Sequence, residues 1–293
     1  MTADRANFHL HRDLGIEHIS ATYEQHRFPP HVHQEYLIGL TVAGVEHIVQ
    51  DGRQWQSRPG QVRTINPGVV HEGGCADGGH WSYEALYIPE PLILEAVLSA
   101  GRVSTAPRLS DAVVDDPRLA AALKRLFESL RSEVEPLRRE EELTLFLSQL
   151  ASHRIMRVDA PLVGREPRAV ARARDYLAAN ALRRVPLEIL ATVSGLSKFH
   201  LLRVFKSQTG LTPWRYQTQL RIDLARRLLA AGEPAGQVAV ACGFVDQSHM
   251  TRRFRQLVGV TPAAYASDTR PGTVRGRDMA QGSRPRSTGG AAR

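Results

Sequence analysis

The chain has 293 residues, a hydrophobic fraction of 42% and a formal net charge of +8, values that suit a soluble globular protein of two domains. It contains no run of 18 apolar residues, which argues against a membrane-spanning helix. The start, MTADRANFHLHRDLG, lacks the features of a signal peptide, and two cysteines, Cys75 and Cys242, do not support a disulfide framework. We therefore expect a cytoplasmic protein.

Charge is unevenly distributed along the chain. Residues 168–268 carry 15 Lys and Arg against 6 Asp and Glu, and residues 269–293 carry 6 against 1. Residues 1–167 carry 17 against 23. This asymmetry predicts that the basic C-terminal part, and not the acidic N-terminal part, meets the phosphates of a nucleic acid.

The N-terminal part has the pattern of β structure from Glu17 to about Ile88. Short alternating runs such as EYLIGLTVAG and HWSYEALYIP are separated by Gly, Pro, Asn and Asp. Frequent turns without an intervening long helix favour a small antiparallel barrel or jelly roll. Cys75 lies in the run GGCADGG, where we expect an exposed turn and an unreactive thiol.

Polar residues in this barrel form the first candidate site. On a strand, residues i and i+2 point to one face, so His31, His33 and Glu35 are expected to share a face. Imidazole and carboxylate groups suit a small polar ligand, and they also suit Fe, Mn, Ni or Zn. Purely structural or surface histidines are the third possibility. Weaker candidates for the same pocket are Arg63, Trp81 and Tyr83.

After Pro89 the hydrophobic pattern becomes helical. It predicts one short helix at 91–99 and two longer helices with apolar stripes at 116–134 and 138–158. An apolar stripe can cover the barrel, contact a second subunit, or do both. The run DAPLVGREPR that follows has no periodicity and predicts an interdomain linker.

Residues 187–265 contain one pattern twice. The copies read LEILATVSGLSKFHLLRVFKSQTGLTPWRY and GQVAVACGFVDQSHMTRRFRQLVGVTPAAY, and corresponding residues lie 48 or 49 positions apart. Each copy has a small residue for a close helix crossing (Ala191 and Ala239) and a Gly for the turn (Gly195 and Gly243). Each then ends on Thr-Pro, which starts a further helix. The repeat therefore predicts two helix-turn-helix units.

A helix from Trp214 to Ala231 is predicted between the copies, with Gly232 as its C-terminal cap. Its length of ~27 Å is comparable with the ~34 Å between successive major-groove segments. In the second helix of each copy, some side chains face away from the expected core and are candidates for contacting DNA. They are Lys198, Phe199, Leu202, Arg203 and Lys206 in copy one, and Gln247, Ser248, His249, Thr251 and Arg252 in copy two.

The run ARRLLAAGEPAGQVAVACGFVDQSHMTRRFRQLVGVTPAAY closely resembles the signature of the AraC/XylS family of bacterial transcription regulators. The resemblance covers residues 168–268, and Met250 replaces an aromatic residue that is usual in the family. It implies that Arg203, Gln247 and Arg252 lie on the base-facing sides of the reading helices. By the chemistry of their side chains, the two arginines suit guanine and Gln247 suits adenine. Phe199 and Leu202 would make apolar base contacts. Phosphate contacts are expected from backbone amides at the Thr-Pro helix starts and from Ser197, Trp214 and Arg215.

The runs FPPHVHQEYLIGLTVAGVEHIVQDG and RPGQVRTINPGVVHEG resemble the cupin-like sensor domain of the same family. The resemblance implies that His71 lies across the barrel from His31 and His33, and that the two long helices take part in dimerisation. Such sensor domains mostly bind a small organic effector without a metal. Enzymatic cupins carry their Glu further along than Glu35, which argues against a metal-dependent enzyme.

We therefore predict an α+β protein of several domains. Residues 1–158 form a cupin-like β-barrel with two or three helices, 159–167 a linker, 168–268 an all-α double helix-turn-helix, and 269–293 a disordered basic tail. The expected function is a homodimeric, non-enzymatic transcription regulator that binds double-stranded DNA and a small polar effector, without a metal or other cofactor. The alternatives are a metal-dependent cupin enzyme fused to a DNA-binding domain, and an architectural DNA binder without a ligand.

Overall fold

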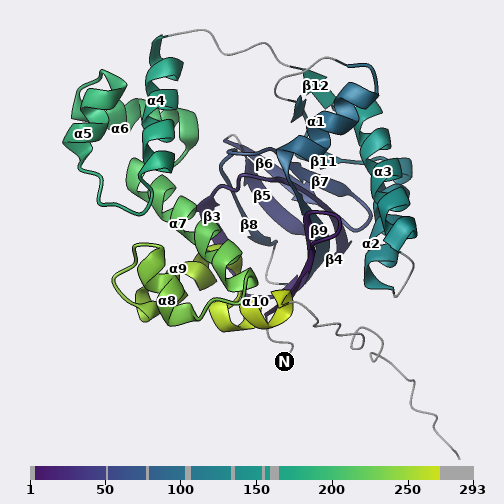
Figure 1. The fold of residues 1–293 in the computed structure, drawn as a ribbon. Coiled ribbons are helices and arrows are strands. Elements are labelled where there is room, and N and C mark those ends of the chain that lie inside the picture. Colours follow the sequence, from purple (N-terminus) through teal and green to yellow (C-terminus); the bar gives the residue numbers. More distant parts are fainter. Residues whose placement is uncertain are drawn as a thin grey trace, which may run out of the picture.

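A computed structural model of the chain describes residues 4–50, 52–76, 79–102, 107–132, 136–153, 156–158 and 165–270. Most of the predicted linker, at 159–164, and most of the predicted tail, at 271–293, lie outside these residues. An N-terminal part built on β-sheets stands beside a C-terminal part built of helices (Figure 1). Within the described ranges, no helix is long and apolar enough to cross a membrane.

Two antiparallel sheets form the N-terminal part, as the alternating apolar runs predicted. The larger sheet contains, in spatial order, β1 (Arg5–His11), β2 (Ile16–Tyr23), β9 (Trp81–Ile88), β4 (Tyr36–Ala43), β7 (Val62–Ile65) and β11 (Val113–Val114). The smaller sheet contains β3 (Arg27–His31), β8 (His71–Cys75), β5 (Glu46–Gln50) and β6 (Arg53–Ser57). A separate pair is formed by β10 (Pro107–Leu109) and β12 (Met156–Val158). The chain passes repeatedly from one sheet to the other, which gives the barrel-like sandwich.

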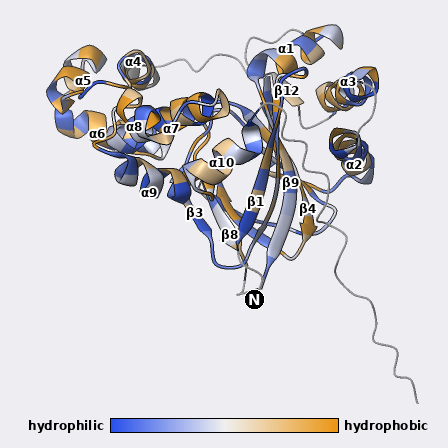
Figure 2. Ribbon diagram, turned by 60° about the horizontal axis from the view of Figure 1, so that its bottom comes forward, coloured by the Kyte–Doolittle hydropathy of each residue, from blue (hydrophilic) through white to orange (hydrophobic). Residues whose placement is uncertain are grey.

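Three helices cover the outer face of the larger sheet: α1 (Glu90–Ser99), α2 (Pro117–Arg131) and α3 (Pro136–Ser152). Side chains of β4 alternate, so Tyr36 and Ile38 pack against these helices while Leu37 points into the barrel. The helix α2 begins where Asp116 accepts hydrogen bonds from the backbone of Arg118 and Leu119. Figure 2 shows these helices on one side of the strands, opposite the C-terminal helices. The predicted apolar stripes are therefore largely used within the chain.

Several predicted boundaries were wrong, and each error has a non-local cause. Strand β1 begins at Arg5, before the predicted start of β structure, because it pairs with β2 along its whole length. Helix α3 ends at Ser152 because the following residues pair with β10 instead of continuing the helix. Cys75 ends β8 and is buried, donating to the carbonyl of Ala76 at 3.3 Å, so the predicted exposed turn is also wrong.

The C-terminal part consists of short helices separated by tight turns. They are α4 (Arg165–Ala179), α5 (Leu187–Ser194), α6 (Lys198–Thr209), α7 (Pro213–Ala230), α8 (Ala235–Ala241), α9 (Gln247–Val258) and α10 (Pro262–Thr269). Helix α4 begins inside the predicted linker. The pairs α5–α6 and α8–α9 are the two predicted helix-turn-helix units, and α7 joins them.

The repeated residues have the same structural role in both units. Ala191 and Ala239 are buried at the helix crossings. Gly195 and Gly243 occupy the turns with φ of 71° and 72°, a left-handed conformation that other residues adopt only with strain. The side chains of Ser197, Thr212, Asp246 and Thr261 cap the helices that follow them.

Two phenylalanines on α6 provide a direct test of this fold. Phe205 is fully buried, whereas Phe199 is 86% exposed. We expect Phe205→Ala to lower the free energy of unfolding of the full chain by ~3–5 kcal/mol, because it leaves a cavity. Phe199→Ala should change it by less than ~0.5 kcal/mol. Urea denaturation followed by circular dichroism measures both, and equal effects would contradict the assigned faces of α6.

Candidate DNA-reading helices and sensor pocket

The outer faces of α6 and α9 carry the predicted base-contacting residues. On α6, Phe199 is almost fully exposed and Leu202 is 37% exposed. Residues of the same helix that also face solvent are Lys198, Arg203 and Lys206. On α9, the exposed residues are Gln247, Ser248 and Arg252, and the half-buried ones are His249 and Thr251. The opposite faces carry the buried residues of each unit, so the predicted base-contacting side chains point away from the core.

Some predicted DNA-contacting residues already have partners in the protein. The hydroxyl of Ser197 accepts from the backbone of His200 at 3.3 Å, and Lys198 contacts Glu188 at 2.7 Å on the surface. In the first turn of α7, Arg215 is exposed. Nearby, the exposed ring of Trp214 lies 5.1 Å from the guanidinium carbon of Arg253. We therefore expect Trp214 to be held in place by α9.

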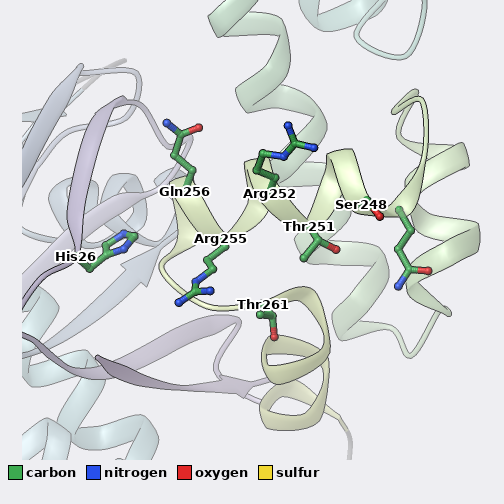
Figure 3. A pocket seen from close by; sticks show the side chains of 8 residues that line it. His26, Ser248, Thr251, Arg252, Arg255, Gln256 and Thr261 are labelled. Carbon is green, nitrogen blue, oxygen red and sulfur yellow. The ribbon is translucent and has the colours of Figure 1, made fainter. Parts of the chain in front are cut away.

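An open groove of about 840 Å³ follows the reading face of α9. Figure 3 shows Ser248, Thr251 and Arg252 along one side and His26, from the turn before β3, at its far end. The groove also contains two α9 residues that the sequence analysis missed, Arg255 and Gln256. Their spacing of three and four residues from Arg252 places them near it on one side of the helix, so helical periodicity alone could have identified them.

His31, His33 and His71 converge inside the barrel. Their nearest ligand atoms lie within 4.8 Å of one another, and all three side chains are buried. His31 and His71 are register partners on β3 and β8. The predicted reason for the convergence was partly wrong, because β3 ends at His31, so His33 lies beyond the strand and Glu35 lies in the bend that follows. Glu35 does not line this pocket; its charge instead acts on Glu17, Asp223 and Arg226 at the domain interface.

The histidine tautomers follow from their hydrogen bonds. The Nδ1 atom of His31 lies 2.8 Å from the carbonyl of Pro29, and that of His71 lies 3.1 Å from the carbonyl of Val69. A carbonyl can only accept, so Nδ1 carries the proton and Nε2 keeps a lone pair. Burial lowers the pKa of His31 to about 4 and lowers the pKa values of His33 and His71 strongly. The three imidazoles are therefore neutral at pH 7.

The other predicted pocket residues, Arg63, Trp81 and Tyr83, all line the same space. The guanidinium of Arg63 lies 5.0 Å from the ring of Tyr83 and forms a buried ion pair with Glu46. Burial raises the pKa of Glu46 to about 7, and Arg63 opposes this rise. Glu46 was not predicted, although it lies two residues from Ile48 on β5 and therefore shares the inward face of that strand.

The pocket is small and is closed by the DNA-binding domain. Its open volume is about 20 Å³, enough for about one water molecule. Leu257 and Val258, at the C-terminal end of α9, form part of its wall. Helix α9, the second candidate reading helix, therefore forms one side of the candidate sensor pocket, an arrangement that no local sequence pattern indicated.

A buried ion pair joins the two domains further along the interface. Arg226 on α7 contacts Glu17 on β2, and each side chain is at most 10% exposed. The guanidinium of Arg226 also lies over Tyr87 of β9, at 4.6 Å, and near Tyr265 of α10, at 5.8 Å. Arg12 donates to the carbonyl of Ala230 at 2.6 Å. The interface thus combines a desolvated charge pair with aromatic packing.

Both reading helices end against the sensor domain. Gly210 and Gly259 occupy equivalent left-handed positions after α6 and α9, with φ of 69° and 90°. A Cβ at Gly210 would lie 2.7 Å from Val70, and one at Gly259 would overlap the hydroxyl of Tyr23. Glycine therefore serves two purposes here: it adopts the positive φ and it allows close contact between the domains.

Gly232 offers a matched control for this contact, because it has a φ of 94° but open space around it. We expect Gly232→Ala to cost only the strain of the left-handed conformation, ~1–2 kcal/mol. Gly259→Ala should cost at least ~1 kcal/mol more, because its methyl group also meets Tyr23. Thermal unfolding of the full-length variants measures the difference. Indistinguishable losses would show that the domains are not in contact at Gly259.

Comparison with known proteins gives a consistent result. The family described as AraC-like ligand binding domain matches residues 13–147, and a helix-turn-helix domain family matches residues 190–268. An uncharacterized HTH-type transcriptional regulator of Bacillus subtilis, YbfI, is 30% identical over 224 residues, which are 76% of this chain and 82% of that protein. The MmsAB operon regulatory protein of Pseudomonas aeruginosa is 27% identical over 256 residues, 84% of this chain and 80% of that protein.

Solved structures of ToxT from Vibrio cholerae share the fold. One matches 86% of this chain and 97% of its own with a TM-score of 0.56 at 12% identity. Another, with an unsaturated fatty acid bound, matches 91% of this chain and 95% of its own with a TM-score of 0.56 at 14% identity. At this level of identity the likeness concerns the two-domain architecture alone.

Proposed function

The chain belongs to the AraC family of transcription regulators, with a ligand-binding N-terminal domain and a DNA-binding helix-turn-helix domain, and from that premise we propose which parts of it read DNA and which pocket controls them. Helices α6 and α9 read two segments of the major groove. The barrel pocket around His31, His33 and His71 receives the effector. One observation carries the link between them: Leu257 and Val258 of α9 form a wall of that pocket.

The two reading helices are connected by α7, which has 18 residues and is therefore ~27 Å long. This length suits two helices that enter adjacent major-groove segments on one face of the duplex. Arg203 and Arg252 each offer a bidentate donor pair for guanine, and Gln247 can pair with adenine. Phe199 and Leu202 contribute apolar contact to thymine methyl groups. Backbone amides at the starts of α7 and α10, with Arg215, bind phosphates and fix the register.

Arg203 and Arg252 give the sharpest test of DNA reading. With a duplex selected from random sequences by the wild-type chain, Arg203→Ala and Arg252→Ala should each weaken specific binding by ~1–3 kcal/mol. Each should also relax the preference at one base pair, and the two positions should lie in different segments of the site. Exposed Arg118 on α2 supplies the control variant, Arg118→Ala, which should bind as the wild type does. Loss of preference at one shared base pair would contradict the two-helix arrangement.

The effector acts through the position of α9. A polar molecule larger than one water must displace part of the pocket wall, because the open volume is about 20 Å³. The part of that wall contributed by the other domain is Leu257 and Val258, so entry of the ligand favours a shifted α9. A ligand changes this equilibrium only by its difference in affinity for the two arrangements. One ToxT structure contains an unsaturated fatty acid, whereas the three imidazoles and the Arg63–Glu46 pair here suit a polar ligand.

Self-association is part of the proposal. The exposed side of α3 retains Leu137 and Leu145, which are 65% and 59% exposed and lie about two turns apart. Pairing of two chains through this side would double the number of DNA contacts. The relatives described above are regulators, which supports this function over a cupin enzyme fused to a DNA-binding domain.

A further inference from the structure

We propose that His31, His33 and His71 bind one divalent transition-metal ion, so that the sensor pocket is a metal site with an open coordination position. The inference rests on the proposed function in one respect only, the assignment of this pocket to effector binding. It departs from the sequence-based expectation of an organic effector without a metal.

The three histidines lie close enough together to share one ion. One ligand atom from each histidine lies within 4.8 Å of the others. The rings of His31 and His71 are 4.1 Å apart and those of His33 and His71 are 4.5 Å apart, centroid to centroid. An ion that binds imidazole at ~2.0–2.1 Å needs its ligand nitrogens ~3–3.5 Å apart. Side-chain rotations that move each ligand nitrogen by ~1 Å toward the others would therefore complete the site.

The orientation of the imidazole rings also suits a metal ion. His31 and His71 each donate Nδ1–H to a backbone carbonyl, so the lone pair of each Nε2 is available to a metal. A hydrogen bond from the second ring nitrogen to a carbonyl is the usual arrangement around metal-bound histidines. His33 is fully buried, and neither of its ring nitrogens finds a partner in hydrogen-bonding geometry among the described residues. The ring of His33 does lie near the backbone of Glu35, but this contact does not have the distance and angles of a hydrogen bond. A metal ion would satisfy this buried group.

The size of the pocket suits an ion. In the present arrangement its open volume of about 20 Å³ accommodates an ion or a water molecule, whereas a larger molecule must first displace part of the wall. Three neutral nitrogen ligands favour Zn²⁺, Fe²⁺, Ni²⁺ or Cu²⁺ over Mg²⁺ and Ca²⁺, which prefer oxygen. Structural zinc sites usually have four protein ligands, whereas three leave a position for water or a small anion. The site is therefore of the open type.

The charges around the histidines are largely balanced. Arg63 and Arg226 lie near them and would repel a cation if they were unpaired. Both add to the effect of burial in lowering the pKa values of His31 and His33. Each is paired with a buried carboxylate, Arg63 with Glu46 and Arg226 with Glu17. Two further carboxylates lie nearby, Glu72 in the pocket wall and Glu35 close enough to Arg226 to act on its charge.

Two series of side-chain contacts connect the histidine site to the DNA-binding domain. The ring of His33 packs edge-on against Tyr87 at 5.2 Å, and Tyr87 supports the guanidinium of Arg226 on α7. The ring of His31 lies 5.7 Å from that of Phe28, which in turn lies beside Gly259 at the end of α9. An ion that draws the imidazoles together would change both contacts.

The test uses the full-length protein, treated with a chelator and then titrated with Co²⁺ or Zn²⁺. We expect one ion per chain, with the visible absorption of Co²⁺ bound by nitrogen ligands, and a higher unfolding temperature with the ion than without it. His33→Gln should weaken binding by more than the roughly 10–100-fold that loss of an outer-shell partner costs. His47→Ala, on β5 of the same sheet and half-exposed, is the matched control and should bind as the wild type does.

Circular dichroism of His33→Gln without metal shows whether this variant is folded, and the Co²⁺ spectrum of the wild type reports the ligands even if the variant is not. The inference is overturned if the wild type binds no ion at micromolar concentration. It is also overturned if His33→Gln, folded, keeps full affinity, which would place the ion elsewhere, for instance near His9, His11 and His18. A chain that binds selected DNA but no ion would refute this inference alone. A chain that binds the ion but shows no sequence preference would refute the proposed function alone.

Discussion

The buried ion pair between Arg226 and Glu17 is the interaction on which the arrangement of this protein depends. Both side chains are buried, so each charge is compensated by the other and not by water. Removal of one partner leaves an uncompensated buried charge, which typically lowers stability by ~3–5 kcal/mol. Arg226 lies on α7, the helix that holds the two helix-turn-helix units, and Glu17 lies on β2, in the larger sheet. The pair therefore fixes the sensor to the connector between the units and not to one unit alone.

The same interface brings both reading helices to the strands that line the pocket. Val32, between His31 and His33, belongs to the apolar cluster of α4–α6. Val70, just before His71, meets the end of α6 at Gly210. On the other side, α9 ends at Gly259 against Phe28 of β3 and contributes Leu257 to the pocket wall. We therefore expect a change in the pocket to act on both units, because the residues beside its histidines contact α6 and the end of α9.

The sequence predicted what depends on local pattern. Caps such as Ser197 and Thr212, the turn glycines and the buried face of α6 are each specified within a few residues, and the repeat identified the DNA-binding domain. Residues that depend on pairing of distant segments were not predicted. Glu46 enters the pocket because β5 pairs with β8, and Leu257 closes it because one domain docks on the other. The convergence of His31 and His71 was expected only from family resemblance, since strand register is not a local property.

The central claim is that the sensor pocket and the DNA-reading helices form one coupled unit. Because coupling is reciprocal, hydrogen–deuterium exchange of the full-length chain, with and without its selected duplex, tests it without knowledge of the effector. The account predicts that DNA binding changes amide exchange in β3 and β8, the pocket walls, as well as in α6 and α9, while the buried amides of α2 and α3 stay unchanged. Changes confined to the C-terminal helices, with β3 and β8 exchanging at the same rate in both states, would contradict it.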